Sequence, residues 1–277
     1  MVATPSALAT ALTIAGSDSS GGAGIQADLR GFASVGVHGA SVIALITAQG
    51  TRGVRRVAPL APDLVRAQLD AVLEDLRPAA CKTGALGNAA NVEIIADALR
   101  SVPKMPLVVD PVVNPTKGRA LLDDSGFAAL VRELLPLATL VVPNRDETVR
   151  LSGGRMRTLE DARRACRVIA ETGVKYVLVK GGHFTGQDVV DLLFDGAEFI
   201  ELRASRVDVP PMHGLGCSLS ALITGHLALG RAVPDAVRFA HDTLHRSLQS
   251  PVRVGEGLLV LSNLDTRIEP DRSSGAK

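Results

Sequence analysis

The segment His213-Gly214-Leu215-Gly216-Cys217-Ser218 has residue types that suit anion binding, and an apolar run with near-helical spacing follows it. Glycines have no Cβ, so the backbone N–H groups of Gly214 and Gly216 can approach a ligand closely. The first amides of a helix have no partner within it, and the helix dipole adds about half a positive charge there. The segment therefore predicts an anion site with Cys217 at its edge, where the same field would lower the pKa of a thiol. A tight turn without a ligand is the alternative.

Other polar and glycine-rich groups come directly after runs that have the character of strands. The carboxyl ends of parallel strands meet at one edge of a sheet, and ligands of open α/β sheets bind there. The groups that follow successive candidate strands are Gly16-Ser17-Asp18, Gln49, Thr83-Gly84, Asp110, Asn144 and Lys180-Gly181-Gly182. This repeated placement predicts a single site at the carboxyl edge of the sheet.

The charged groups among them suit phosphate chemistry. Lys180 ends an apolar strand and needs a partner, which a phosphate or a buried carboxylate would supply, unless its ammonium group reaches solvent. Asp110 and Glu147 are candidates for Mg²⁺, because a hard cation that bridges phosphates needs one or two carboxylates. Asn144 and Glu147 also have the spacing of a helix capping box, a purely structural role. With the anion site, this set is typical of phosphoryl transfer, in which positioning and charge stabilisation dominate catalysis.

The first of these loops, residues 16–24, is rich in glycine and serine but has neither the dinucleotide fingerprint nor the Walker A spacing. It could enclose a small ligand with backbone groups, or form a turn with a serine cap. Asp28, in the helix that follows, could point into the site and hydrogen-bond a ligand. Alternatively, it is an exposed acid near a helix N-terminus. The six histidines show no convincing metal spacing, so we expect no zinc site.

Short β-rich runs alternate with longer amphipathic ones along the whole chain. The predicted strands are Leu8–Ala15, Ser41–Ala48, Ala80–Lys82, Leu107–Asp110, Thr139–Val142, Tyr176–Val179, Val189–Phe194 and Phe199–Leu202. The predicted helices are Ala23–Val35, Ala61–Leu76, Asn88–Ser101, Ser125–Leu135, Asp146–Leu151, Leu159–Thr172, Cys217–Leu229 and Pro234–Leu248. Several strands are continuously apolar, as in a parallel sheet covered on both faces. The alternation predicts an α/β fold with a mostly parallel central sheet, in a single domain over residues 1–264 with a disordered tail at 265–277.

Composition excludes several other classes of protein. The net charge of +1 argues against nucleic acid as the main partner, which usually demands a basic face. No apolar run reaches membrane-spanning length. The three cysteines are widely spaced and suggest neither disulfides nor a metal site, so we expect a reduced, cytoplasmic setting. Aromatic residues make up 3% of the chain, so a flat ligand would be held mainly by aliphatic walls and backbone groups.

Several motifs, collinear from about Ala11 to about Ser247, resemble the hydroxymethylpyrimidine/phosphomethylpyrimidine kinases of thiamine biosynthesis. They are residues 11–18 (ALTIAGSD), 21–29 (GGAGIQADL), 47–49 (TAQ), 82–86 (KTGAL), 109–112 (VDPV), 143–144 (PN), 179–183 (VKGGH) and the His213-Gly214-x-Gly216-Cys217 segment. The first two are specific to this family and its pyridoxine-kinase relatives. The resemblance implies a ribokinase-like fold, ATP with Mg²⁺, a homodimer, and two successive phosphorylations of a hydroxymethyl pyrimidine.

The resemblance also implies roles for residues at matching positions. Gln49 and Asp28 would hydrogen-bond the pyrimidine, and its pocket would be lined by Gly16, Ala23, Ala85 and Val112. Asn144 and Glu147 match a magnesium-linked Asn-x-x-Glu motif, and Asp110 is the other metal candidate. Catalysis and nucleotide binding would fall to Lys180 and to the amides of Gly214, Leu215, Gly216 and Cys217, which would face the ATP phosphates and the transferred group. Cys217 itself stands where sugar kinases of this fold have an Asp base.

This sequence departs from the family pattern more on the ATP side than on the pyrimidine side. Met212 and Leu215 replace two threonines, Lys117 is displaced by one position, and Gly50 replaces an asparagine. Two alternatives therefore stay open beside a pyrimidine kinase. One is a pyridoxal/pyridoxine kinase, whose substrate is also flat, heteroaromatic and hydroxymethylated. The other is a pyrimidine-binding protein that has lost ATP chemistry.

Overall fold

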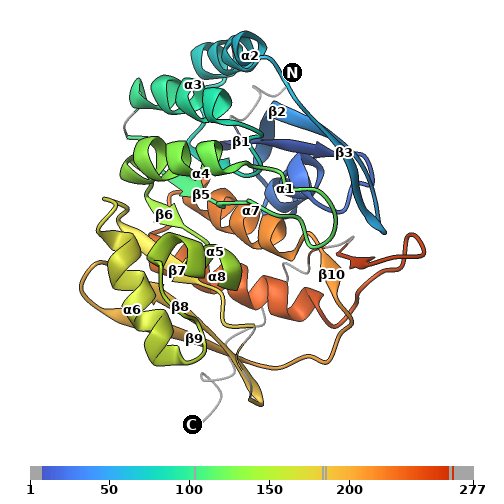
Figure 1. Ribbon diagram of the computed structural model, residues 1–277, viewed down its shortest axis with the longest axis vertical. Coiled ribbons are helices and arrows are strands. Elements are labelled where there is room, and N and C mark those ends of the chain that lie inside the picture. Colours follow the sequence, from blue (N-terminus) through green and yellow to red (C-terminus); the bar gives the residue numbers. More distant parts are fainter. Residues whose placement is uncertain (1–7, 103, 183, 185, 262–263, 265–277) are drawn as a thin grey trace, which may run out of the picture.

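The computed structural model describes residues 8–261 and 264, except 103, 183 and 185. Its centre is a nine-stranded sheet in the order β3-β2-β1-β4-β5-β6-β7-β8-β9 (Figure 1). The strands are β1 (Thr10–Asp18), β2 (His38–Gly50), β3 (Gly53–Pro59), β4 (Ala80–Thr83), β5 (Leu107–Val109), β6 (Leu140–Val141), β7 (Tyr176–Val179), β8 (Asp188–Phe194) and β9 (Phe199–Ser205). A separate pair consists of β10 (Met212–His213) and β11 (Leu259–Val260).

Eight α-helices in the described part of the chain connect and cover these strands. They are α1 (Gly24–Ser34), α2 (Pro62–Asp75), α3 (Ala89–Arg100), α4 (Asp124–Ala129), α5 (Arg145–Ser152), α6 (Leu159–Ala170), α7 (Leu215–Ala228) and α8 (Val233–Ser247). The six central strands pair in parallel, in the order β2, β1, β4, β5, β6 and β7. Antiparallel pairs are added by β3 at one end of the sheet and by β8 and β9 at the other. The predicted α/β fold with a mostly parallel sheet is confirmed.

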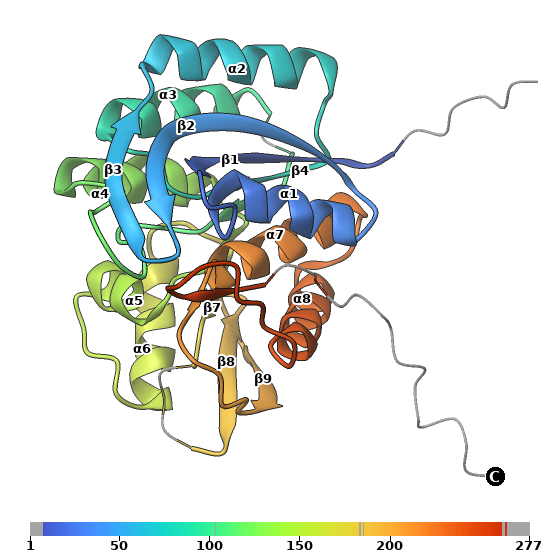
Figure 2. The ribbon, with the colours of Figure 1, turned by 90° about the vertical axis from the view of Figure 1, so that its right-hand side faces the viewer.

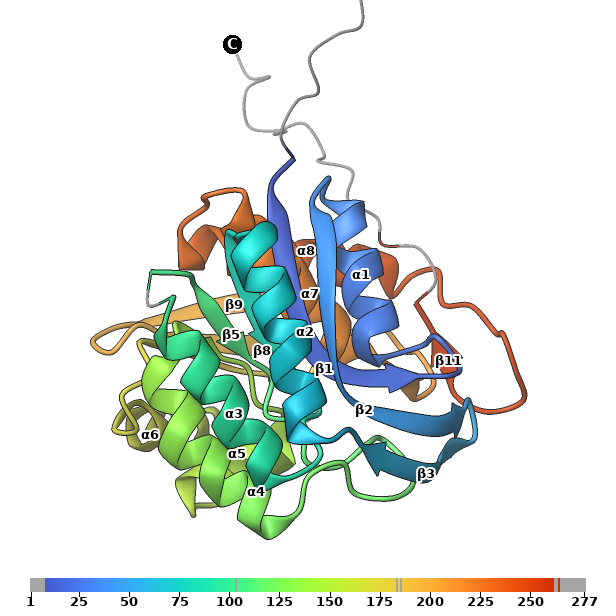
Figure 3. The ribbon, with the colours of Figure 1, turned by 90° about the horizontal axis from the view of Figure 1, so that it is seen from above.

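Helices cover both faces of the sheet. On one face, α1 packs against β1 and α7, and α7 packs in turn against β4, β5 and α8 (Figure 2). On the other face, α2 packs on β2 and α3, and α6 packs on β7 and β8 (Figure 3). Successive side chains of a strand point to opposite faces, so a buried strand needs apolar residues throughout. In β5, for example, Val108 packs in the core beneath α7 and Val109 in the core beneath α3.

Besides shifts of a few residues at the ends of elements, the structure differs from the predicted elements in three places. Strand β3 was not expected, because its exposed Arg55 and Arg56 lack the pattern of a buried strand, and it pairs only at the edge of the sheet. Strands β10 and β11 have two residues each, too few to give a periodic signal. The helix predicted over Ser125–Leu135 begins at Asp124, where Asp123 accepts a hydrogen bond from the Gly126 amide, and becomes a π-helical turn from Leu130 to Leu134.

Further expectations concern the extent of the domain, the C-terminal tail and membrane-spanning segments. The single domain over residues 1–264 stays a prediction, and the tail at 265–277 lies outside the described residues. None of the described helices is long and apolar enough to cross a membrane.

Candidate active site

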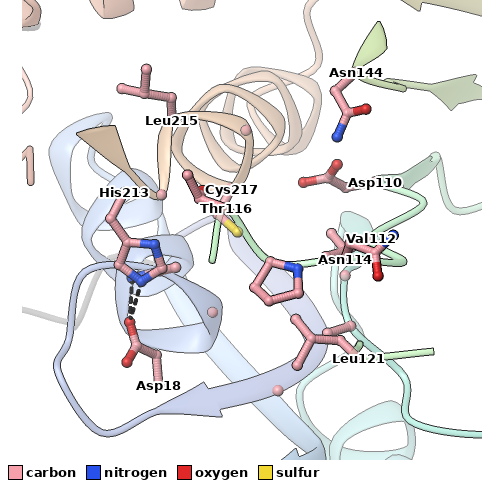
Figure 4. Close-up of a pocket in the computed structure, with 18 of the residues that line it drawn as sticks. Asp18, Asp110, Val112, Asn114, Thr116, Leu121, Asn144, His213, Leu215 and Cys217 are labelled. Carbon is pink, nitrogen blue, oxygen red and sulfur yellow. Dashed lines mark hydrogen bonds and ion pairs between the residues drawn. The ribbon is translucent and has the colours of Figure 1, made fainter. Parts of the chain in front are cut away.

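A pocket of about 590 Å³ lies at the carboxyl ends of the parallel strands, beside the N-terminus of α7 (Figure 4). It brings together the strand-end groups of β1, β2, β4, β5, β6 and β7, as their sequence positions predict. Of the residues implied by the family motifs, those that line it are Gly16, Ala23, Gln49, Ala85, Asp110, Val112, Asn144, Glu147, Lys180, Gly214, Leu215, Gly216 and Cys217. Asp28 does not line it. The roles of the lining residues stay predictions.

The α7 N-terminus is built around a backbone contact that only glycine permits. Gly214 is the N-cap of α7 and has φ 82°, in the left-handed region. A Cβ on Gly214 would lie 2.0 Å from the carbonyl oxygen of Gly22 in the first glycine loop. The helix begins at Leu215, two residues before the predicted start, so the amides of Leu215, Gly216 and Cys217 belong to its first turn. These N–H groups have no helical acceptor and are available to an anion in the pocket.

The thiol of Cys217 has the opposite pKa shift from the one expected. Burial raises its pKa to about 12, more than the cation of Lys82 lowers it. The helix N-terminus was expected to lower this pKa, but the sequence did not show that other elements would pack around this half-buried residue or that Asp28 and Asp110 would act on it. Cys217 is therefore a neutral thiol at physiological pH, able to donate a hydrogen bond but not to act as a ready base.

Lys180 and Asp110 form a charged pair beside these amides. The Lys180 ammonium lies 3.8 Å from Asp110 Oδ1, and the Ser220 hydroxyl donates to Asp110 Oδ2 at 3.1 Å. A Cβ on Gly216 would lie 3.2 Å from the Lys180 nitrogen, so the glycine leaves the lysine room to reach the helix N-terminus. Of the two partners considered for Lys180, the structure shows the carboxylate, while the ammonium still faces the pocket.

Asn144 and Glu147 cap α5 reciprocally, as their spacing predicts. The Asn144 side chain accepts from the Glu147 amide at 3.0 Å, and the Glu147 carboxylate accepts from the Asn144 amide at 2.8 Å. Glu147 is also buried, and burial raises its pKa to about 7, with Lys180 acting to lower it and Asp110 to raise it further. A bound cation would offset the cost of ionising this buried carboxyl beside the Asp110 carboxylate.

The donor set fits Mg²⁺ better than a metal enclosed by protein. Among the described residues there is no cluster of three or more His, Cys, Asp or Glu side chains that could hold a metal ion. Mg²⁺ typically uses one or two carboxylates and completes its shell with water and phosphate oxygens. Asp110 and Glu147 supply that number, so they fit a magnesium ion that arrives with a phosphate ligand.

Asp18 and His213 connect the first glycine loop to the α7 N-terminus, and sequence reasoning gave neither a role. His213 Nε2 lies 2.9 Å from Asp18 Oδ2, and the Asp18 carboxylate also accepts from the amides of Ser20 and Ala23 at 2.8 Å (Figure 4). Burial acts to raise the pKa of Asp18, but the hydrogen bonds from His213, Ser20 and Ala23 lower it to about 2. The only sequence signal was their position next to the glycines.

Asp28 corrects another expectation. Its side chain is fully buried beneath the pocket, where the Lys82 ammonium lies 2.7 Å from Oδ1 and the Thr13 hydroxyl donates to Oδ2 at 2.6 Å. Burial opposes the charge of Lys82, but the Asp28 carboxylate raises the pKa of the ammonium above its ordinary value. Asp28 points toward the sheet, because α1 packs directly on β1. It neither lines the ligand pocket nor lies at the surface, so it is a structural partner of Lys82.

Sequence reasoning also missed Asp191 of β8, which holds the loop after Lys180. Its buried carboxylate accepts the Gly181 amide at 2.8 Å. A Cβ on Gly181 would lie 1.8 Å from the carbonyl oxygen of Val190, so the loop and β8 meet at a distance that excludes a side chain. The available signal was an acidic residue in the middle of the apolar run Val189–Phe194.

Comparisons with known proteins identify the family that this chain resembles. A family model described as "Phosphomethylpyrimidine kinase" matches residues 18–262. The "Hydroxymethylpyrimidine/phosphomethylpyrimidine kinase" of Rhizobium meliloti is 46% identical over 252 residues, covering 90% of this chain and 94% of the relative. A pyridoxal kinase from Staphylococcus aureus, solved with AMP-PCP and pyridoxal, is 31% identical with a TM-score of 0.86, covering 95% and 97%. A phosphomethylpyrimidine kinase from Clostridium difficile 630 is 37% identical with a TM-score of 0.76, covering 87% and 98%.

The buried pair beneath the pocket gives a first prediction. Replacing Lys82 with Met should lower the free energy of unfolding by about 3–5 kcal/mol, because it leaves Asp28 buried without its cation. Urea denaturation of the wild type and the variant measures this. The double variant Lys82→Met/Asp28→Leu should recover part of the loss. A single variant as stable as the wild type would contradict the structural role of the pair.

A second prediction concerns pH and Asp18. Its pKa is lower in the folded protein than the ordinary value of 3.8, so its contribution is present above about pH 4 and is lost as the pH falls through about 2. The shift corresponds to about 2 kcal/mol, so Asp18→Asn should lower the free energy of unfolding at pH 7 by about that amount. The difference from the wild type should shrink between pH 4 and pH 2. The exposed Asp208→Asn is the control, and an equal loss in both variants would refute the assignment.

Proposed function

This chain belongs to the phosphomethylpyrimidine kinase family and is therefore a phosphotransferase; we propose that it phosphorylates 4-amino-5-hydroxymethyl-2-methylpyrimidine, and then its monophosphate, with ATP in thiamine biosynthesis. One observation carries the proposal: a single pocket joins an apolar, glycine-walled part to a part rich in phosphate-binding groups. The apolar part has Gly16, Ala23, Ala85 and Val112, with the carboxamide of Gln49 at its edge. The other part has Lys180, Asp110 and the first amides of α7.

The chemistry follows from how these groups divide the pocket. Glycine and alanine walls leave space for a flat ring, and the ring's hydroxymethyl group would face the α7 N-terminus. Its oxygen attacks the terminal phosphorus of ATP, the bond from that phosphorus to the bridging oxygen breaks, and ADP leaves. Charge on the transferred group is stabilised by the amides of Leu215, Gly216 and Cys217 and by Lys180. Mg²⁺, held by Asp110 and Glu147 directly or through water, would neutralise phosphate charge when bound.

Cys217 acts in this proposal as a positioning donor rather than as the base. Its thiol keeps its proton near neutral pH because burial raises its pKa to about 12. Phosphoryl transfer usually has a loose transition state with little need for early deprotonation of the nucleophile. The hydroxymethyl proton can therefore leave late, to solvent or to the phosphate, while the thiol orients the oxygen.

Met212 and Leu215 do not remove the groups that the proposal needs. Leu215 packs against an apolar cluster of Met212, Leu259 and Leu261, so the two departures from the family's threonines complement each other. The anion-binding amides belong to the backbone and are kept whatever the side chains are. This packing favours an active kinase over a pyrimidine-binding protein without ATP chemistry.

A pyridoxal kinase remains the second candidate. The observation that favours it is the TM-score of 0.86 with the Staphylococcus aureus pyridoxal kinase, against 0.76 with the Clostridium difficile phosphomethylpyrimidine kinase. The deciding experiment measures ATP consumption with the hydroxymethylpyrimidine, its monophosphate and pyridoxal in parallel. The proposal expects the highest kcat/KM with the first two. A higher value with pyridoxal would favour the second candidate, and no turnover with any of them would refute both.

Two further parts of the proposal rest on the family resemblance and on composition. We expect a homodimer, because the resemblance implies one, and a cytoplasmic location, because the three cysteines are free in the described structure.

The role of Cys217 gives a third prediction. As a positioning donor, its loss in Cys217→Ala should lower kcat by about tenfold or less, the effect of one hydrogen bond. A general base would contribute about 10²–10⁴-fold. Cys217→Ser should keep most of the activity because it keeps a donor. Steady-state kinetics with saturating ATP decides, and a fall of a thousandfold in Cys217→Ala would restore the base assignment.

The metal assignment gives a fourth prediction. Glu147→Gln keeps the capping geometry but removes the charge, so the Mg²⁺ concentration for half-maximal activity should rise by about tenfold. The dissociation constant for the pyrimidine, measured without nucleotide, should stay unchanged. Asp146→Asn, an exposed neighbour at the same pocket, is the control. An unaltered Mg²⁺ requirement in Glu147→Gln would exclude Glu147 from the metal site.

A further inference from the structure

Gln49 is held from three directions at the edge of the pocket. Its backbone is fixed by the Ser19 hydroxyl, which accepts from the Gln49 amide and donates to the Gln49 carbonyl, both at 2.8 Å. Its carboxamide lies between Thr47, from the same strand, and His213, from β10. The oxygen and the nitrogen of the half-buried carboxamide therefore each have one partner within the protein. One lone pair of the oxygen and one N–H hydrogen are left for the pocket that Gln49 lines.

One nitrogen of His213 lies within hydrogen-bond distance of both Asp18 and the Gln49 carboxamide. His213 Nε2 lies 2.9 Å from Asp18 Oδ2 and 2.7 Å from Gln49 Nε2. With a hydrogen on His213 Nε2, the imidazole donates to the carboxylate, but two N–H donors then face each other at Gln49. Without that hydrogen, the imidazole accepts from Gln49, but a lone pair then faces a buried carboxylate. The Asp18 carboxylate can only accept, and a lone pair 2.9 Å from it would be repelled, so this contact favours the hydrogen on Nε2.

The contact with Thr47 has the same difficulty. The Thr47 hydroxyl lies 3.0 Å from the Ser17 carbonyl oxygen and 3.1 Å from Gln49 Oε1. A hydroxyl has one hydrogen and cannot donate fully to two oxygens. If it donates to the Ser17 carbonyl, which has no hydrogen to offer, it can only accept from Gln49.

The oxygen and nitrogen of a carboxamide have nearly the same shape, so a half-turn is possible. It removes the conflict at Thr47, and at His213 it replaces two facing N–H groups with one hydrogen shared between two acceptors. We propose that Asp18, His213 and Thr47 lock the Gln49 carboxamide with its oxygen toward His213 and its nitrogen toward Thr47. The single hydrogen on His213 Nε2 is then shared between Asp18 Oδ2 and the Gln49 oxygen. Gln49 donates to Thr47, and Thr47 donates to the Ser17 carbonyl. Every hydrogen in this chain has an acceptor.

The locked orientation determines which substrate edge the pocket accepts, an argument that rests on the proposed function. The free end of the carboxamide presents one acceptor beside one donor, the complement of an amino group next to a ring nitrogen. Turning the carboxamide around exchanges their order. An aminopyrimidine would then pair only when turned over, with its hydroxymethyl group directed away from the α7 N-terminus. Thr47 and His213 are thus positioning residues that determine specificity through Gln49.

The first test reads the hydrogen position without any substrate. A long-range ¹H–¹⁵N correlation spectrum reports which imidazole nitrogen carries hydrogen, and comparison with His213→Asn assigns the signals. We expect hydrogen on Nε2 of His213 at neutral pH. A neutral ring with hydrogen only on Nδ1 would overturn the proposal. Because no turnover is involved, this result does not depend on whether the proposed kinase function is correct.

The second test measures specificity. Thr47→Val keeps the shape but removes the hydroxyl, so kcat/KM for the hydroxymethylpyrimidine should fall by about tenfold, while KM for ATP stays unchanged. Thr47→Ser should restore it. Pyridoxal has no amino group next to its ring nitrogen, so its kcat/KM should fall less. Equal kcat/KM in wild type and Thr47→Val would overturn the lock, whereas a wild type without activity on either substrate would overturn the proposed function alone.

Discussion

Two glycine loops from opposite ends of the chain meet backbone to backbone, and the geometry of the site depends on that contact. Gly214 approaches the carbonyl of Gly22 so closely that a Cβ on Gly214 would lie 2.0 Å from it, and a Cβ on Gly22 would lie 2.6 Å from the His213 ring. The same approach brings His213 to Asp18. The apolar part of the pocket and the first turn of α7 are therefore held in one fixed arrangement, as in-line transfer between two bound groups requires.

Buried charge explains why the part of the pocket beside the α7 N-terminus suits phosphate. Lys82 is paired with Asp28 below the pocket and has no exposed surface. Lys180 and Asp110 are paired more loosely, and the Asp110 carboxylate adds to the effect of burial in raising the pKa of Glu147. The deep pair is complete and supports the structure. The shallower group is a lysine and two carboxyls with incomplete partners, and a phosphate with its cation would complete both.

Much of the fold and of the site's membership follows from local sequence, because parallel strands must end at one edge and each strand end had a recognisable polar or glycine residue. Features that depend on packing between distant segments did not follow. Asp28 could be placed in a helix but not assigned to Lys82, which lies fifty-four positions away. The pKa of Cys217 was expected to fall because only the helix dipole was visible; the burial that raises it comes from other elements. Strand β3 was missed because an edge strand needs no buried pattern.

The departures of this chain from its family are informative because they fall on side chains rather than on amides. Met212 and Leu215 replace hydroxyls, yet both join an apolar cluster with Leu259 and Leu261. An anion site made by the first amides of α7 loses no N–H group when a neighbouring side chain becomes apolar, and it gains a drier surrounding in which those N–H groups act more strongly. Substrate specificity, in contrast, depends on side chains. It rests on Gln49, whose carboxamide is nearly symmetrical in shape, so that only its hydrogen-bonding neighbours can set its orientation. Side-chain changes around the α7 N-terminus are thus tolerable, whereas a change at Thr47 or His213 alters which substrate the pocket recognises.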